Sequence, residues 1–288
     1  MTRRHFLLLG TSALAAPALA HLPKPQKERF SGDAVLRRIA EKAKAEGWAR
    51  LPIGERMGHI GLELVGTPYV AFTLETEEPV EYCTVNLEGL DCVTFFESSL
   101  DMARVLPGGL TKDRLVKAVR QTRYRDGKQG DYTSRLHYTM DWFYDNERKG
   151  IVKVLTNELP GAEPFTQRVG FMSSHPNSYK QLKANPTLVP KIAETEARIN
   201  ARPKTYIPTA AIAAIEPLLR TGDIIGLCAT QEGIDIAHTG MAYRREDGVL
   251  CFFDATNGTG RNDVKLGGRL SERLNPKSHT GIVVARPL

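Results

Sequence analysis

The chain has 288 residues and a formal net charge of +6 at neutral pH, with 41% hydrophobic and 25% charged residues. These values are typical of a folded globular protein with one large domain or two small ones, and they exclude a collagen-like, coiled-coil or disordered chain. The basic residues are scattered and lack interleaved aromatic residues, so no nucleic-acid partner is expected.

The N-terminus has the features of an export signal. Arg3 and Arg4 precede an apolar run over residues 7–19, and the small residues at 18–20 suit a signal peptidase. The paired arginines resemble the twin-arginine signal, although an ordinary secretory signal also explains them. We predict a signal peptide over residues 1–20, export to the periplasm and a mature net charge of about +4, which is +6 less two arginines. No later apolar run is long enough to span a bilayer, so stable membrane insertion is not expected.

The rest of the chain predicts helices first and strands last. Residues 21–32 are a predicted polar linker. Helical spacing of apolar residues predicts helices over residues 33–48, 54–65, 90–106, 112–123, 132–147, 189–201 and 208–219. Strands are predicted over residues 69–75, 80–87, 151–156, 223–229, 234–243, 249–255 and 281–285. This order predicts a single α+β domain over residues 33–288, with N-terminal helices packed on a C-terminal antiparallel sheet.

Cys92 is the candidate nucleophile. It follows a turn and begins a predicted helix, for which Asp91 is a good N-cap. A thiol at a helix N-terminus lies at the positive end of the helix dipole, beside free backbone N–H groups. Both favour the attacking thiolate, and the N–H groups can stabilise an oxyanion. The alternative is that Cys92 is a small buried residue on the core face of this helix, and its position alone does not decide between the two.

His238 is the candidate base. It lies on the predicted strand 234–243, which reverses around residues 245–248 into the strand 249–255. A loop of three or four residues would place His238 opposite Asp254 or Ala255, whereas a two-residue turn would not. If His238 and Asp254 share a face, the carboxylate can orient the imidazole while the other ring nitrogen faces a thiol. Otherwise His238 is an ordinary sheet histidine and Asp254 caps the following turn.

Several motifs resemble a known superfamily, the NlpC-type papain-like cell-wall cysteine peptidases. The matching segments are Gly66-Thr67-Pro68-Tyr69, Asp91-Cys92, Thr221-Gly222-Asp223-Ile224-Ile225 and His238-Thr239-Gly240-Met241. Two longer segments resemble motifs of one branch of this superfamily, the N-acetylmuramoyl-L-alanine amidase-like branch. They are Asn86-Leu87-Glu88-Gly89-Leu90-Asp91-Cys92-Val93-Thr94-Phe95 and Tyr132-Thr133-Ser134-Arg135-Leu136-His137-Tyr138 with Asp141-Trp142. The third catalytic position of the superfamily is often His, Asn or Gln, and here we place Asp254.

The resemblance implies a papain-like fold with a large helical insertion, at about residues 110–204, between nucleophile and base. It also implies hydrolysis of the amide that joins N-acetylmuramic acid to L-alanine in small peptidoglycan fragments (muropeptides). Such a reaction proceeds through an acyl-enzyme and needs neither a metal nor an organic cofactor. The alternatives are a D-glutamyl–diamino acid endopeptidase of the same fold and a non-catalytic envelope-binding module.

Three matched residues near the nucleophile are candidate substrate contacts. Tyr69 can place its hydroxyl near the thiol or the oxyanion, or it is a half-buried strand tyrosine. Asn86 and Asp91 flank Cys92, and Asp91 can act as a helix cap at the same time.

Three further candidate contacts lie on the predicted helix 132–147. Arg135 can clamp a peptide carboxylate in a bidentate manner or form an internal salt bridge to Asp131 or Asp141. His137 lies beside it between aromatic residues. Trp142 can stack on a sugar or belong to the core.

The other three cysteines have no evident reactive role. Cys228 and Cys251 lie on strands that we expect to be close together, yet disulfide geometry is so demanding that we predict both to be reduced and buried. Cys83 precedes the nucleophile and is expected to point into the core. The oligomeric state does not follow from the sequence.

Overall fold

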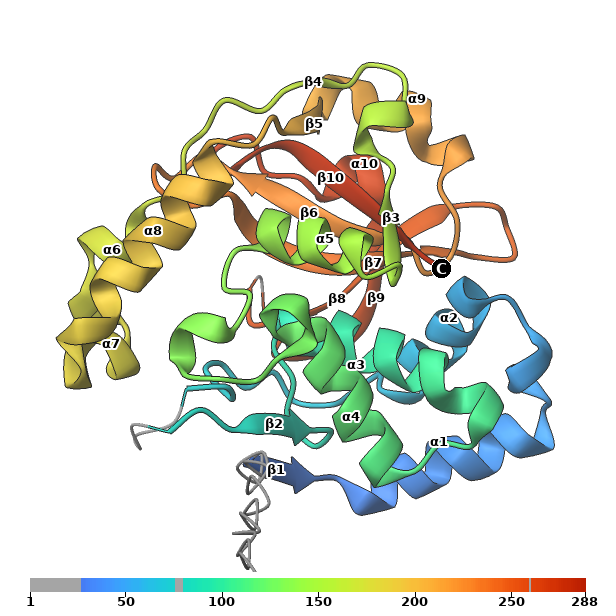
Figure 1. Ribbon diagram of the computed structural model, residues 1–288. Helices are drawn as coiled ribbons and strands as arrows, with labels where there is room; N and C mark the ends of the chain where they lie inside the picture. The colour runs from blue at the N-terminus through green and yellow to red at the C-terminus, as the bar shows by residue number, and fades with distance from the viewer. Residues whose placement is uncertain (1–26, 76–79, 259) are drawn as a thin grey trace, which may run out of the picture.

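The structure is a computed structural model that describes residues 27–75, 80–258 and 260–288 (Figure 1). The predicted signal peptide, residues 1–20, lies outside these ranges. None of the helices in the described ranges is long and apolar enough to cross a membrane.

The N-terminal half is mainly helical. Its principal helices are α1 (Asp33–Ala45), α2 (Ile53–Glu63), α3 (Cys92–Val105), α4 (Lys112–Arg123) and α5 (Thr139–Arg148). Further helices follow as α6 (Phe171–Ser174), α7 (Lys180–Ala184) and α8 (Val189–Asn200), and later α9 (Ile212–Ile215) and α10 (Leu270–Arg273). The helices predicted over 33–48, 54–65, 90–106, 112–123 and 189–201 are therefore confirmed to within a few residues.

The strands form two sheets. A small parallel pair joins β1 (Glu28–Ser31) to β2 (Cys83–Asn86). The main antiparallel sheet has the order β4-β5-β10-β6-β7-β8-β9, with β3 also pairing with β10. Its strands are β3 (Val152–Val154), β4 (Glu163–Pro164), β5 (Thr205–Pro208), β6 (Ile224–Ala229), β7 (Ile236–Arg244), β8 (Leu250–Thr256), β9 (Asp263–Arg269) and β10 (His279–Pro287). The predicted α+β class, with N-terminal helices and a C-terminal antiparallel sheet, is confirmed.

Hydrophobic packing covers both faces of the main sheet. Phe253 joins the core formed with α1 to α5, whereas the adjacent Phe252 joins a second core with α9 and α10, as strand alternation requires. Helix α2 approaches the sheet closely because of its glycines: a Cβ on Gly61 would lie 2.3 Å from the terminal methyl of Met241. A third core holds α6 and α8 together at one side of the molecule (Figure 1).

Three predictions need correction. The predicted linker contains β1, which the backbone of β2 holds in parallel register. The helix predicted over 132–147 begins only at Thr139, because residues 132–134 form a separate turn whose cap is Asp131. The strand predicted over 69–75 is reduced to single bridges of Pro68 and Tyr69. The sequence reading also missed β4 and β5, which are too short for an alternating pattern, and β9, whose Gly267-Gly268 pair obscures it.

Candidate active site

Cys92 is the first residue of α3 and is partly exposed. Asp91 caps this helix: its carboxylate accepts the N–H of Thr94 at 2.7 Å, and the Thr94 hydroxyl accepts the N–H of Asp91 at 2.9 Å. The capping box satisfies the N–H of Thr94, the third residue of the helix. The backbone N–H groups of the first two residues, Cys92 and Val93, have no acceptor within the described chain. The local sequence thus places a thiol and two free donors together.

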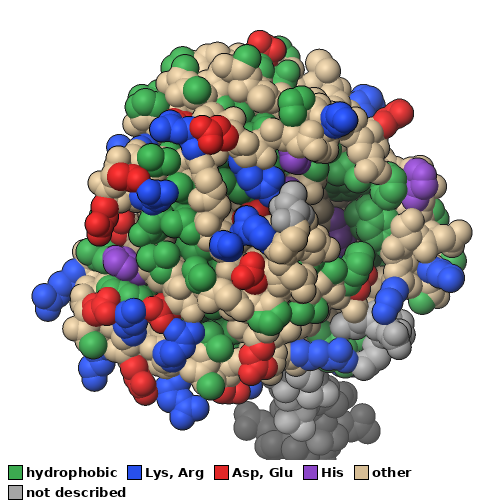
Figure 2. Space-filling view, turned by 180° about the vertical axis from the view of Figure 1, so that it is seen from behind, with side chains coloured by type: hydrophobic (Ala, Val, Ile, Leu, Met, Phe, Trp, Pro, Cys, Tyr) green, Lys and Arg blue, Asp and Glu red, His purple; other side chains and the backbone are tan. Residues whose placement is uncertain are grey.

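A cavity of about 210 Å³ opens beside Cys92. Residues 234–239, including the start of β7, form one wall. Side chains from the long segment between α4 and β5, such as Tyr138 and Met172, form the other. One face of the molecule is visibly hollowed, with histidine side chains in the depth of the hollow (Figure 2).

His238 lies between Cys92 and Asp254. Its Nε2 is 2.8 Å from Oδ2 of Asp254, so Nδ1 is the ring nitrogen left for the thiol of Cys92, which lines the same cavity. Burial would lower the pKa of His238, but the hydrogen bonds to Asp254 and Cys92 outweigh it and raise the pKa to about 9. The imidazolium is therefore the favoured form at neutral pH.

The strand register that brings His238 to Asp254 differs from the predicted one. Met241 lies opposite Phe253, so Asp254 is a diagonal neighbour of His238 on the same face rather than its direct partner. The predicted pairing with Asp254 was two residues out of register, and the alternative with Ala255 was one residue out. The first keeps the shared face of His238 and Asp254, because side chains alternate with period two.

Asp254 is fully buried and is held by two arginines that the sequence reading missed. Arg261 donates to Oδ1 at 3.2 Å and Arg273 to Oδ2 at 3.1 Å. Burial acts to raise the pKa of Asp254, but the hydrogen bond from His238 and the two guanidinium charges bring it below its ordinary value. Arg261 lies in the connection between β8 and β9 and Arg273 at the end of α10, and no local pattern marks them.

Tyr69 reaches the site through the segment 66–69. The backbone of Leu90 bonds Pro68 and Val70, both at 3.0 Å, which places Tyr69 beside the start of α3. Burial, together with the charges of Cys92 and Asp91, raises the pKa of Tyr69 to about 12. Its hydroxyl therefore stays protonated and can donate a hydrogen bond near the thiol.

Three of the predicted substrate contacts have structural partners instead. The Asn86 side chain accepts from Ser31 and from the backbone of Glu88, which shapes the turn before the nucleophile. Arg135 is buried and binds Glu75 and the carbonyl of Leu74, so it forms an internal salt bridge, although not with the predicted partners Asp131 or Asp141.

Trp142 is also a core residue rather than a sugar platform. It is only 2% exposed, its ring packs edge-on against Phe96, and its indole N–H donates to Glu97 at 3.2 Å. His137, in contrast, does line the cavity with Cys92. The predicted set therefore divides: Tyr69, Asp91 and His137 lie at the site, and Asn86, Arg135 and Trp142 support it from behind.

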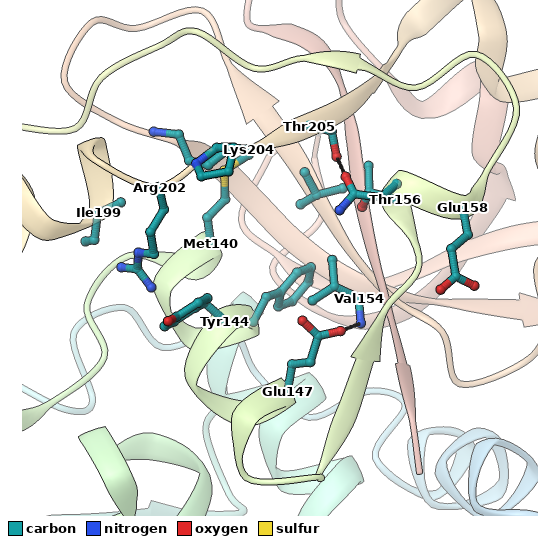
Figure 3. A pocket seen from close by; sticks show the side chains of 14 residues that line it. Met140, Tyr144, Glu147, Val154, Thr156, Glu158, Ile199, Arg202, Lys204 and Thr205 are labelled. Carbon is teal, nitrogen blue, oxygen red and sulfur yellow. Dashed lines mark hydrogen bonds between the residues drawn. The ribbon is translucent and has the colours of Figure 1, made fainter.

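A larger cavity, of about 330 Å³, lies away from Cys92 between α5, α8 and β3 (Figure 3). Its charged groups are already used within the protein. Glu147 accepts the N–H of Val154 at 2.8 Å, Arg202 binds Asp141, and Lys204 donates to the carbonyl of Gln167 at 3.1 Å. It contains no paired nucleophile and base, so we place the active site at Cys92. Within the described residues, no cluster of His, Cys, Asp or Glu has the arrangement of a metal site.

Comparisons with known proteins identify the family of the chain. The family described as AmiA-like, N-acetylmuramoyl-L-alanine amidase-like, matches residues 59–267. Two crystal structures of an N-acetylmuramoyl-L-alanine amidase from Bacteroides uniformis are 32% and 33% identical, with TM-scores of 0.75 and 0.74. The alignments cover 82% of this chain and 99% and 98% of those chains.

A protein from Legionella pneumophila, 20% identical over 88% of this chain and 95% of its own, shares the fold with a TM-score of 0.65. None of the curated proteins is significantly similar to the chain. Since the family match spans most of the sequence and includes Cys92 and His238, the chain belongs to the N-acetylmuramoyl-L-alanine amidase-like family.

Proposed function

We propose that the protein is a cysteine-dependent amidase that hydrolyses the amide bond between N-acetylmuramic acid and L-alanine in muropeptides. The observation that carries the proposal is the triad-like arrangement of Cys92, His238 and Asp254. In it, a thiol at a helix N-terminus lies beside an imidazole that a buried carboxylate orients. Family membership supports the choice of bond, because the relatives from Bacteroides uniformis bear the name of this activity.

In the proposed first step, the Cys92 thiolate attacks the lactyl carbonyl carbon of the muramoyl group. The N–H groups of Cys92 and Val93 stabilise the oxyanion, and the protonated Tyr69 hydroxyl is a candidate for a further donor. When the C–N bond breaks, the His238 imidazolium gives its proton to the leaving amine of L-alanine, and a thioester to Cys92 remains.

In the proposed second step, water attacks the thioester carbonyl. His238, now neutral, takes a proton from this water, and the C–S bond breaks to release the muramoyl carboxylic acid and the Cys92 thiolate. Asp254 keeps the ring in one orientation through both steps, because its hydrogen bond to Nε2 leaves Nδ1 directed at the reacting atoms.

We further infer a papain-like fold of the NlpC type, in which residues of about 110–204 are an insertion that walls the cavity. Tyr132, Tyr138 and Met172, which line the cavity, come from this segment. The cavity volume of about 210 Å³ is below the roughly 300–1,000 Å³ of common small-molecule pockets. The small volume therefore favours a short released fragment over a polymeric wall.

The test is incubation with defined muropeptides and analysis of the products by mass. The proposal requires that wild type releases L-alanyl peptides and a free muramoyl acid, and that Cys92→Ser does not. Cys83→Ser is a matched control, since it changes a second thiol on the preceding strand. Cleavage between D-glutamate and the diamino acid would instead establish the endopeptidase, and binding without cleavage would establish a non-catalytic module.

We also propose that the protein is exported to the periplasm through residues 1–20. The apolar run with Arg3 and Arg4 before it supports this. The mature chain is then expected to begin near His21, as determined by N-terminal sequencing. Replacement of both arginines by lysine should block export if the route is twin-arginine, whereas normal export of this variant would indicate the general secretory route.

A further inference from the structure

The cavity beside Cys92 has an unusual set of polar groups on the wall contributed by Glu75 and His137. Both side chains line the same 210 Å³ cavity as Cys92 and His238. Neither belongs to the proposed catalytic triad of Cys92, His238 and Asp254. Each of them can therefore serve to bind a ligand.

Glu75 has one carboxylate oxygen in use and one free. Oε1 accepts from the Arg135 guanidinium and from the Tyr132 hydroxyl, the latter at 3.3 Å. Oε2 is buried and has no hydrogen-bond partner within the described chain. A buried carboxylate oxygen without a partner is costly, because its desolvation is not repaid by a hydrogen bond. A donor supplied by a ligand in the cavity would complete it.

His137 offers a second acceptor. Its Nε2 lies 2.8 Å from the carbonyl of Tyr132, and the two rings pack with their centroids 4.4 Å apart. Burial and the charge of Arg135 lower the pKa of His137 to about 3, so the ring is neutral at physiological pH. Nε2 then carries the proton that it donates to Tyr132, and Nδ1 is left as an acceptor.

The charged residues of the cavity lining indicate which donor groups of a substrate can bind there. The lining contains no lysine or arginine, and its one group that favours the cationic form is His238. It also contains the acidic residues Glu75 and Asp235. The peptide part of a muropeptide carries carboxylates, which this wall would repel. The muramoyl sugar is neutral, because its lactyl carboxyl is part of the scissile amide, and it bears hydroxyl and acetamido N–H donors.

We propose that Glu75 and His137 form an acceptor subsite that binds hydrogen-bond donors of the neutral muramoyl sugar. This proposal rests on the proposed function, since it assigns the sugar half of the same substrate. Arg135 has a positioning role, because it binds Oε1 of Glu75 and leaves Oε2 without a partner. The subsite makes the enzyme select a sugar on the acyl side of the scissile bond.

The experiment compares two substrates that share the scissile amide. One is a muramoyl-L-alanyl peptide, and the other is a lactyl-L-alanyl peptide without the sugar. Glu75→Gln should lower kcat/KM for the muropeptide roughly tenfold or more, mainly through KM, because it removes a charge-assisted acceptor. It should leave kcat/KM for the sugar-free peptide within about twofold of wild type, since that substrate never contacts the subsite.

A second variant guards against a folding defect. His137→Gln keeps an N–H donor for the carbonyl of Tyr132 but removes the Nδ1 acceptor, and it should show the same selective loss to a smaller extent. Glu41→Gln, on the exposed side of α1, is the matched control and should change neither substrate. Thermal unfolding of each variant is measured alongside.

Three results would overturn the subsite. Equal losses on both substrates would indicate a structural role for Glu75, and no loss on the muropeptide would remove Glu75 from binding. The third result is that the enzyme cleaves a peptide with a free N-terminal amine and that Glu75→Gln slows this cleavage. It would mean that the carboxylate of Glu75 binds an ammonium group instead of the sugar. If wild type cleaves neither of the two substrates, the proposed function fails, but the subsite can still be tested by binding. The affinity of Cys92→Ala for the muropeptide is then compared with that of the double variant Cys92→Ala/Glu75→Gln, and equal affinities would refute the subsite.

Discussion

Cys83 and Cys92 lie nine residues apart in the sequence but in different chemical environments. Cys83 lies on β2 with no exposed surface, its Sγ 3.9 Å from the carbonyl of Val116, and burial raises the pKa of its thiol to about 11. Cys92 begins α3 and lines an open cavity together with His238. A thiol on the buried strand is therefore a small core residue, whereas a thiol at the start of the helix is accessible and able to react.

The largest expected effect is the loss of Cys92. Cys92→Ala should reduce hydrolysis by a factor on the order of 10⁴ or more, because no other group can form the acyl-enzyme. Folding should be nearly unchanged, as measured by thermal unfolding. Cys83→Ala is the control: it should keep the activity and lose about 1–2 kcal/mol of stability from the core. Turnover retained by Cys92→Ala would remove Cys92 from the mechanism.

The next effect concerns the base. His238→Ala should lower kcat at least about 10²-fold, since the thiol then lacks its proton acceptor and the leaving amine its acid. His59, which stacks on Trp48 at 4.9 Å, provides a control histidine whose replacement should leave kcat intact. Similar losses in both variants would mean that the effect comes from destabilisation.

Chemical labelling sharpens the comparison of the cysteines directly. Iodoacetamide at neutral pH should modify Cys92 at least roughly tenfold faster than the buried thiols, because only Cys92 is accessible and beside an imidazolium. All four cysteines are free, as predicted for Cys228 and Cys251, and Cys83 is buried as expected. Alkylation of denatured, unreduced protein should therefore add four groups by intact mass. Two added groups would reveal a disulfide.

The smallest expected effect is a shift in pH dependence. The pKa of His238 is about 9 in the folded protein, above its ordinary 6.5. Its stabilising interactions are therefore fully present below about pH 6.5 and lost as the pH rises through about 9. The alkaline limb of kcat/KM should fall in the same range, because the general acid is lost.

Asp254→Asn tests this explanation. Since the hydrogen bond to Asp254 helps to raise the pKa of His238, the alkaline limb should move to lower pH in this variant. The measurement is the pH profile of kcat/KM for both proteins. An alkaline limb at the same pH in both would mean that another group controls it.

Short-range patterns accounted for most of the elements. The predicted helix 112–123 and the start of α3 were correct because caps and apolar spacing act within three or four residues, as the capping box of Asp91 and Thr94 illustrates. The shared face of His238 and Asp254 was also predictable, because a hairpin of known strands allows few registers. The turn at residues 132–134 was not, because apolar and aromatic residues there mimic the spacing of a helix while Asp131 caps a separate turn.

The sequence by itself determined the candidate nucleophile and base, the α+β order and the resemblance to the family that the comparisons established. Only the tertiary structure decided which of the candidate side chains face the cavity beside Cys92. Trp142 packs into the core against Phe96 and donates to Glu97, and Asp254 is held by His238 and by two arginines, one before β9 and one in α10. The physical reason is that burial and ion pairing depend on segments distant along the chain, whereas caps and strand alternation depend on adjacent residues.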